Sequence, residues 1–198
     1  MRIAPLLALC CSCPLWAVEP TDLRLNVELW SSDYSLDIID PSGSFSSSED
    51  LEFDNAFSVR VSMTQPLGLL ETGDLISVLS IGYLDATDDD VGSLELRYQG
   101  VAGRYGFGYR ADLGTAFSLD VYPFLGAGWN SFEVGDSSDP SYVIDLGAQA
   151  DLTLTFGDWQ LGGLVGWNWR QSSHSTENLE WELSYQALTY GLSAGYRF

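Results

Sequence analysis

Apolar and polar residues alternate one by one over long stretches of this chain. The longest stretch runs from Tyr142 to Phe156, with an apolar residue at every even position and Asp145, Gln149 and Asp151 among the residues between. Because successive side chains of a β-strand point to opposite faces, this pattern predicts a strand with one apolar and one polar face. Such a run exceeds the usual strand of about 5–6 residues. It suits a tilted membrane crossing of about 9–11 residues that continues into water.

Composition excludes several classes of protein. The chain has 198 residues and a net charge of −20, with 28 acidic residues against 8 basic ones, all of them arginine. Such an acidic chain cannot neutralise a run of phosphates, so nucleic acid is excluded as a partner. No apolar run reaches the roughly 18 residues of a spanning helix. The length is sufficient for one folded domain with a sizeable core.

Residues 1–17 have the features of a signal peptide. Arg2 precedes a short apolar stretch, and Ala17 supplies a small residue before the expected cleavage site. We therefore expect export and a mature domain over residues 18–198. All three cysteines lie in the leader, at Cys10, Cys11 and Cys13. The mature chain then has no disulfide and no thiolate metal site, and we expect no cofactor. A lipoprotein cut before Cys13 is the alternative.

Turn signals divide the rest of the chain into eight predicted strands. They span 22–31, 56–65, 74–84, 93–109, 115–132, 141–156, 159–171 and 185–198. A bilayer offers no water to an open sheet edge, so spanning strands must close into a barrel. The expected fold class is all-β, a single eight-stranded antiparallel up-and-down transmembrane β-barrel. In the strand 74–84, Ile76 and Val78 oppose Leu79 and Ile81, which leaves its lipid face undecided.

The predicted connections alternate between long and short. The long acidic ones are Ser32–Asp54, Asp85–Gly92, Glu133–Ser141 and Gln171–Ser184, and the short ones are Pro66–Gly73, Arg110–Gly114 and the turn Gly157–Asp158. Long external loops and short periplasmic turns are typical of outer-membrane barrels. We interpret the acidic loops as a solvated surface. A calcium or magnesium site at Asp88–Asp90 is the alternative, although no spacing there matches a formed calcium loop.

The barrel interior is the candidate functional site. Eight strands enclose a space that side chains just fill, and the residues predicted to point into it are Arg24, Glu28, Arg60, Glu95, Arg97, Asp120, Asp145, Asp151, Arg170 and Arg197. Buried ions must pair. We expect Glu28 to pair with Arg60, and Arg97 or Arg170 to pair with Asp120 or Asp145. Arg104 joins them only if a bulge near residues 101–103 changes the parity of its strand.

Aromatic residues stand where a membrane girdle is expected. Those near the predicted outer rim are Trp30, Trp129, Trp167 and Trp169, and those near the periplasmic rim are Trp159 and Phe198. A soluble lipocalin-like barrel is the alternative fold, and it would turn its apolar face inward.

Two stretches carry a family resemblance. The C-terminal alternation of Tyr190, Leu192, Tyr196 and the final Phe198 resembles the signal read by the outer-membrane assembly machinery. Residues 122–129 resemble a fifth-strand segment of small OmpA-type barrels. The resemblance implies a compact, OmpX-like monomer in the cell outer membrane, surrounded by lipid and lipopolysaccharide and inserted by that machinery.

The expected role is structural or surface-interactive, without catalysis. A passive narrow pore or a hydrophobic-solute carrier is the first alternative. A lipid A-modifying hydrolase is the second, because His174 lies among serines and precedes Glu177. The family's His-x-Ser pattern is absent, since Thr176 stands two residues after His174.

Overall fold

The computed structural model describes residues 21–39, 46–70, 73–88, 96–134, 137–175 and 180–198. They form nine strands: β1 (Asp22–Ile39), β2 (Ser46–Glu52), β3 (Asn55–Leu70), β4 (Gly73–Asp88), β5 (Leu96–Asp112), β6 (Phe117–Val134), β7 (Ser137–Phe156), β8 (Trp159–Ser175) and β9 (Glu180–Arg197). Within these ranges, no helix is long and apolar enough to cross a membrane.

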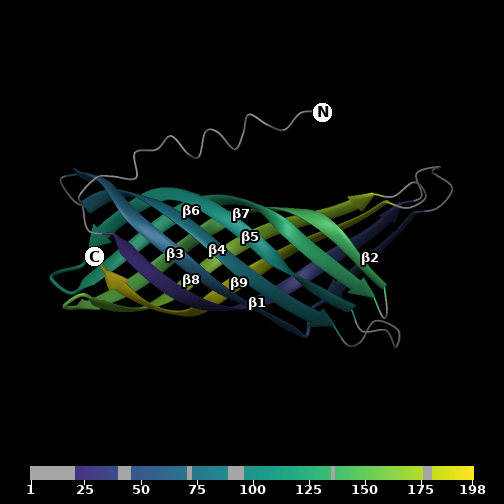
Figure 1. Cartoon of the computed structure of the whole chain (residues 1–198), viewed down its shortest axis with the longest axis horizontal. Coiled ribbons are helices and arrows are strands. Elements are labelled where there is room, and N and C mark those ends of the chain that lie inside the picture. The colour runs from purple at the N-terminus through teal and green to yellow at the C-terminus, as the bar shows by residue number, and fades with distance from the viewer. Residues whose placement is uncertain (1–20, 40–45, 71–72, 89–95, 135–136, 176–179) are drawn as a thin grey trace.

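The sheet closes on itself as a tilted barrel (Figure 1). Antiparallel pairing runs in chain order from β3 to β9, and β1 pairs with both β3 and β9. The β1–β9 closure is continuous from Asp22 opposite Arg197 to Ile39 opposite Glu180. Strand β2 pairs only with the far half of β1, so the ring itself has eight strands. The predicted fold class is confirmed. We call the end where β1 begins and β9 finishes the basal end, and the opposite one the upper end.

Apolar side chains cover the outside of the barrel in a band of limited height. On β1 the outward residues from Leu23 to Leu29 are 42–50% exposed, and the next outward residue, Ser31, is polar. The other strands contribute, among others, Val59, Ile81, Tyr105, Leu125, Ile144, Val165 and Leu192. This stretch of β1 covers seven residues, and the outward apolar stretch of β8 from Trp159 to Trp167 covers nine, against the about 9–11 residues that a tilted strand needs in a bilayer. A lipocalin-like fold is excluded, because the apolar faces point outward.

Above the band, the inward side chains become apolar and the outward side chains become polar. Trp30 and Tyr34 point inward and are 5% and 2% exposed, whereas the outward positions of upper β1 include Ser31, Ser35 and Asp37. The β1–β9 register is unbroken through this change. The exchange therefore comes from the change in what surrounds the barrel, and no irregularity of the backbone causes it. Once a strand has left the lipid, water favours polar residues outside and apolar residues inside.

Six of the eight ring strands are longer than the alternation predicted, whereas β5 and β6 have the predicted lengths. The ring strands have 16 to 20 residues. Much of each predicted long loop is strand: Ser32–Asp54, for example, contains upper β1 and all of β2. The loop interpretation was wrong there, because charged outward residues above the membrane resemble loop composition. The turn at Gly157–Asp158 is confirmed, with Gly157 in the left-handed region at φ 61°.

The structure also fixes the facing of residues on β1, β4 and β5 that the sequence placed wrongly or left undecided. The β4–β5 register is regular along its whole length, so there is no bulge, and Arg104 and Tyr98 both point inward. Trp30 lies inside and not in a girdle, whereas Trp129 and Trp159 are outward and 69% and 61% exposed. On β4, Leu79 and Ile81 face outward, while Ile76 and Val78 pack inside against Tyr122 and Phe124.

Replacing Ile81 with arginine tests the apolar band. Ile81 is 60% exposed on the outside, and Ile81→Arg should lower the free energy of unfolding from lipid vesicles by about 2–4 kcal/mol if it faces hydrocarbon. Ser35→Arg, at an outward position of upper β1 opposite Ser184, should change it by less than about 0.5 kcal/mol. Urea titration of the two variants measures the difference, and equal losses would contradict the placement of the band.

Candidate functional site

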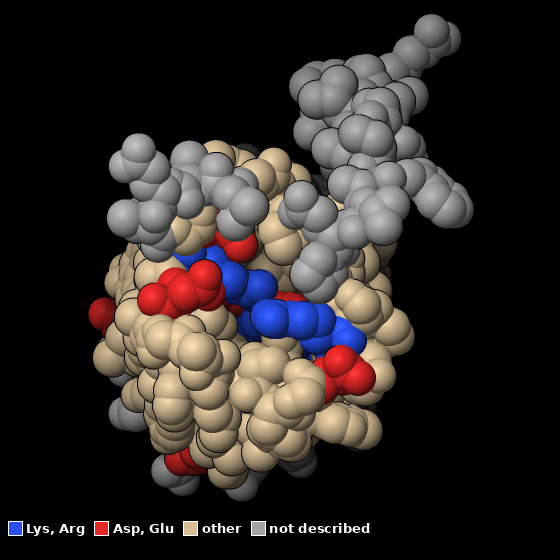
Figure 2. All heavy atoms as spheres, turned by 90° about the vertical axis from the view of Figure 1, so that its left-hand side faces the viewer, with Lys and Arg blue, Asp and Glu red and all other residues tan. Residues whose placement is uncertain are grey.

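Three arginines and three aspartates fill the basal end of the lumen, and we call them the basal network: Asp22, Arg24, Arg110, Asp120, Asp151 and Arg197. Asp22 accepts from all three arginines, from Arg24 Nη2 at 3.1 Å, Arg110 Nη2 at 2.8 Å and Arg197 Nε at 2.8 Å. Arg110 also binds Asp120 through two nitrogens at 2.6 and 2.8 Å. Seen from this end, a row of blue side chains crosses the barrel mouth, with red side chains beside it (Figure 2).

A second group of charges lies above it, and we call it the central network: Glu28, Arg60, Arg104, Asp145 and Arg170. Arg60 Nη1 donates to Glu28 Oε1 at 2.9 Å, and Ser58 Oγ donates to the other Glu28 oxygen at 2.9 Å. Arg104 Nε and Arg170 Nη2 donate to the same Asp145 oxygen, Oδ2, at 2.5 and 2.8 Å. Both guanidinium groups lie over the Trp30 ring, with their Cζ atoms 5.4 and 5.1 Å from its centroid.

Aromatic side chains fill the lumen above the charges, and the aromatic cap consists of Trp30, Tyr34, Phe53, Tyr98, Phe132 and Tyr185. Tyr34 stacks on Phe53 at 4.2 Å, and Tyr98 meets Tyr185 edge-on at 5.8 Å. Two of the tyrosine hydroxyls in the cap have partners, since Tyr98 bonds Ser172 and Tyr34 donates to Asp88 Oδ2 at 2.9 Å. Asp88 is therefore a buried acceptor, while Asp89 and Asp90 lie outside the described residues.

The structure places most of the predicted lumen residues inside. The inward and buried ones are Arg24, Glu28, Arg60, Asp120, Asp145, Asp151 and Arg170. Arg197 sits at the basal mouth, 33% exposed. Glu28 pairs with Arg60, and Arg170 pairs with Asp145. Asp120 pairs instead with Arg110 and Arg24. Glu95 lies outside the described residues.

Arg97 is a correction. It lies on the outer wall above the apolar band, 40% exposed, and binds Asp85 of β4 with its Nε and Nη2 at 3.1 and 2.6 Å. Beside it, Gln99 donates to Glu133 at 3.0 Å. Arg97 and Gln99 both point outward, because water surrounds the barrel at this height. The polar positions of an alternating strand, arginine included, point inward only where lipid surrounds the barrel.

Sequence reasoning missed Asp22 and Arg110 as lumen residues. Asp22 stood at the predicted start of a strand, and Arg110 in a predicted turn. The two-residue alternation of strand faces would have placed them in the lumen. Asp22 is two residues from Arg24, and Arg110 is six residues from Arg104 on β5.

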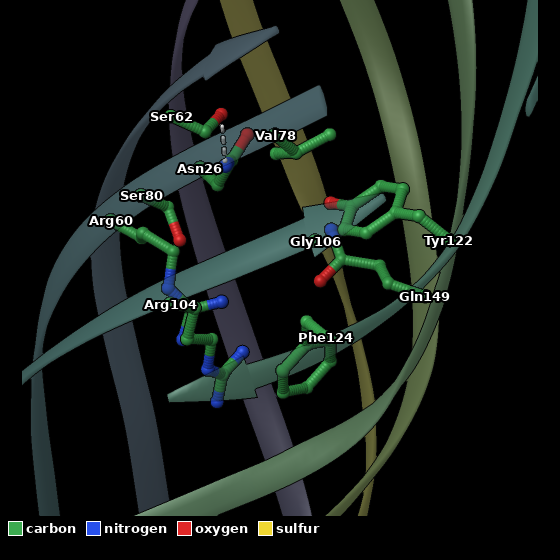
Figure 3. Close-up of a pocket in the computed structure, with 10 residues that line it drawn as sticks. All are labelled: Asn26, Arg60, Ser62, Val78, Ser80, Arg104, Gly106, Tyr122, Phe124 and Gln149. Carbon is green, nitrogen blue, oxygen red and sulfur yellow. Dashed lines mark hydrogen bonds between the residues drawn. The ribbon is translucent and has the colours of Figure 1, made fainter. Parts of the chain in front are cut away.

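A small cavity lies between the basal and central networks (Figure 3). Its volume is about 10 Å³, and it is lined by Asn26, Arg60, Ser62, Val78, Ser80, Arg104, Gly106, Tyr122, Phe124 and Gln149. This is close to the space that one water molecule needs. At this height the lumen is filled by side chains.

The remaining predicted features lie on the outer wall or near the upper end. Tyr190, Leu192 and Phe198 of the C-terminal signal point outward and are 55%, 73% and 72% exposed, and Tyr196 is half-buried. His174 pairs with Trp181 in the β8–β9 ladder, but its side chain lies outside the described part. Among the described residues, no three His, Cys, Asp or Glu side chains gather as a metal ion would require.

Comparisons with known proteins identify the fold. No family model and no curated protein matches the sequence. The outer membrane protein OprG from Pseudomonas aeruginosa is similar in structure, with a TM-score of 0.52 over 90% of this chain and 95% of that chain at 12% identity. The fold is that of an outer-membrane β-barrel.

Other solved barrels give lower scores. Neisserial surface protein A matches with a TM-score of 0.49 at 12% identity, covering 88% of this chain and 97% of that one. Ail of Yersinia pestis matches at 0.47 and 12% identity, covering 90% and 98%.

Glu28→Gln tests the central network. It leaves Arg60 buried without its carboxylate, and we expect a loss of about 3–5 kcal/mol in the free energy of unfolding. Combining it with Arg60→Gln should cost less than the sum of the two single changes, because neither charge is then stranded. Asp85→Asn, which removes the partner of the exposed Arg97, should cost less than about 1 kcal/mol. Denaturant titration in micelles, followed by tryptophan fluorescence, measures all four variants. Strict additivity would refute the pairing.

Proposed function

We propose that this protein is a small structural barrel of the cell outer membrane, with a filled lumen and an acidic extension that contacts partners at the cell surface. The observation that carries the proposal is the separation of its side chains. Six of the seven described arginines lie in the lumen, and the outer band is apolar. Such a wall suits lipid, and such a lumen suits a plug of ion pairs.

The upper end supports the surface role. Upper β1 and β2 form an antiparallel extension beyond the apolar band, with Asp37 and Asp50 on it. The second edge of β2 pairs with no strand among the described residues. Charged residues on such an edge oppose pairing with other sheets. An acidic extension of this kind favours partners that carry positive charge.

The proposal extends to the lipid contacts, the assembly and the export of the barrel. The outer band would contact outer-membrane lipid and lipopolysaccharide, and the outward C-terminal residues would be read by the assembly machinery. The resemblance to OmpX-like barrels supports a monomer exported by the leader over residues 1–17. We assign no catalysis and no cofactor. A hydrolase at His174 has no support from side chains of the described residues.

A passive pore or solute carrier is the second candidate, and the lumen opposes it. A cavity of about 10 Å³ holds about one water molecule, and the aromatic cap fills the lumen above it. We expect no steady current when the purified protein is inserted in planar bilayers, with a large porin as the positive control. Stable, reproducible channel steps would favour the pore over the plugged barrel.

Single cysteines test location and orientation. All native cysteines lie at positions 10–13, so an introduced thiol is unique once the leader is removed. Ser173 is exposed near the upper end of β8, and Asp158 is exposed in the basal turn. On intact cells, an impermeant maleimide should label Ser173→Cys and not Asp158→Cys, and both should react after lysis. The reverse pattern, or recovery of the protein in the soluble periplasmic fraction, would contradict the proposal.

A further inference from the structure

The two buried charge networks differ in their balance. The basal network has three arginines and three aspartates, which balance one another. The central network has three arginines, Arg60, Arg104 and Arg170, and only two carboxylates, Glu28 and Asp145. All five side chains are at most 5% exposed. The centre of the lumen therefore carries one positive charge more than the described side chains compensate.

The geometry shows where this excess charge lies. Arg60 is held by Glu28, and Arg170 shares one oxygen of Asp145 with Arg104. Arg104 binds only through Nε, and its Nη1 and Nη2 have no hydrogen-bond partner among the described residues. The residue is 4% exposed, so bulk solvent does not reach these two nitrogens. The uncompensated guanidinium edge is thus buried.

The same guanidinium borders the cavity. Arg104 and Arg60 extend toward one another on one side of it (Figure 3). Phe124 covers a face of the Arg104 guanidinium, with its ring centroid 4.3 Å from Cζ, and leaves the edge as the donor surface. Ser80 is the cross-strand neighbour of Arg104 and also lines the cavity. Two cationic donors and a hydroxyl thus surround a space of water-like size.

We propose that this cavity binds a small monatomic anion, chloride in physiological media, between Arg60 and Arg104. An isolated charge in the interior costs several kcal/mol, and an anion removes that cost. A water molecule would accept hydrogen bonds from Arg104 but would leave the charge uncompensated. Sulfate and phosphate are excluded by size, since the space of about 10 Å³ holds about one water-sized occupant. The site is a further binding function of the lumen, and the surface role does not depend on it.

Bromide provides a direct test, because it replaces chloride and scatters anomalously. Crystals of the wild-type protein grown in bromide should show an anomalous peak in the cavity between Arg60 and Arg104. Ser80→Asp places a carboxylate opposite Arg104, so the peak should vanish in that variant. Bromide found only at the surface or in lattice contacts, with water alone in the wild-type cavity, would overturn the proposal.

Stability in solution provides the second test. In micelles at equal ionic strength, the thermal midpoint of the wild-type protein should be several degrees higher in chloride than in gluconate, which is too large for the cavity. Arg97→Gln, which changes the outer-wall arginine, should keep this difference. Arg104→Gln and Ser80→Asp should lose it. An equal difference in all four proteins would contradict a lumen site.

Ser80→Asn separates charge from bulk. Both Ser80→Asp and Ser80→Asn fill the cavity, but only the aspartate balances the central charge. In gluconate, Ser80→Asp should therefore unfold at a higher temperature than Ser80→Asn, with folding of each verified by heat-modifiable gel mobility. If the asparagine variant is equally stable, or if only the aspartate variant fails to fold, the charge imbalance is refuted.

Discussion

Hydrocarbon offers no hydrogen-bond partner to a polypeptide backbone, and this constraint governs the whole molecule. Strands can cross it only in a closed ladder. The β1–β9 pairing, continuous from Asp22 to Ile39 on β1, provides that closure. Once the ring is closed, every outward side chain within the band meets lipid, so charged residues lie in the lumen or beyond the band at either end. The apolar band, the charged lumen and the polar upper wall all follow from this one requirement.

The charged lumen in turn depends on carboxylates that each bind more than one arginine. Asp22 accepts from three arginines, and Asp145 accepts from two. Guanidinium suits this arrangement, because its five N–H donors in a fixed fork can reach several carboxylates at once. An ammonium group is a point charge and lacks that geometry. This gives a physical reason for the presence of arginine, and of no lysine, in a chain whose cations are mostly buried.

Alternation was sufficient to predict the closed ring and the facing of residues within the lipid, as for Arg24 and Arg60. It failed above the band. Trp30 and Tyr98 are apolar or aromatic and yet point inward, and Arg97 is charged and points outward, because water there replaces lipid outside the wall. Alternating hydrophobicity shows that the two faces of a strand have different surroundings. It does not show whether the outer face meets lipid or water. Partners across the lumen, such as Asp22 with Arg110, depend on register and tilt, which no local pattern contains.

The central claim is that the greasy face of each strand contacts lipid and the charged face does not. Isoleucine offers matched probes, because Ile81 and Ile144 are 60% and 53% exposed on the outer band, whereas Ile76 is fully buried inside. With protonated isoleucine methyl groups in an otherwise deuterated protein, nuclear Overhauser effects from detergent acyl chains should reach Ile81 and Ile144 and be absent at Ile76. Acyl-chain contacts at Ile76, with none at Ile81, would contradict the account.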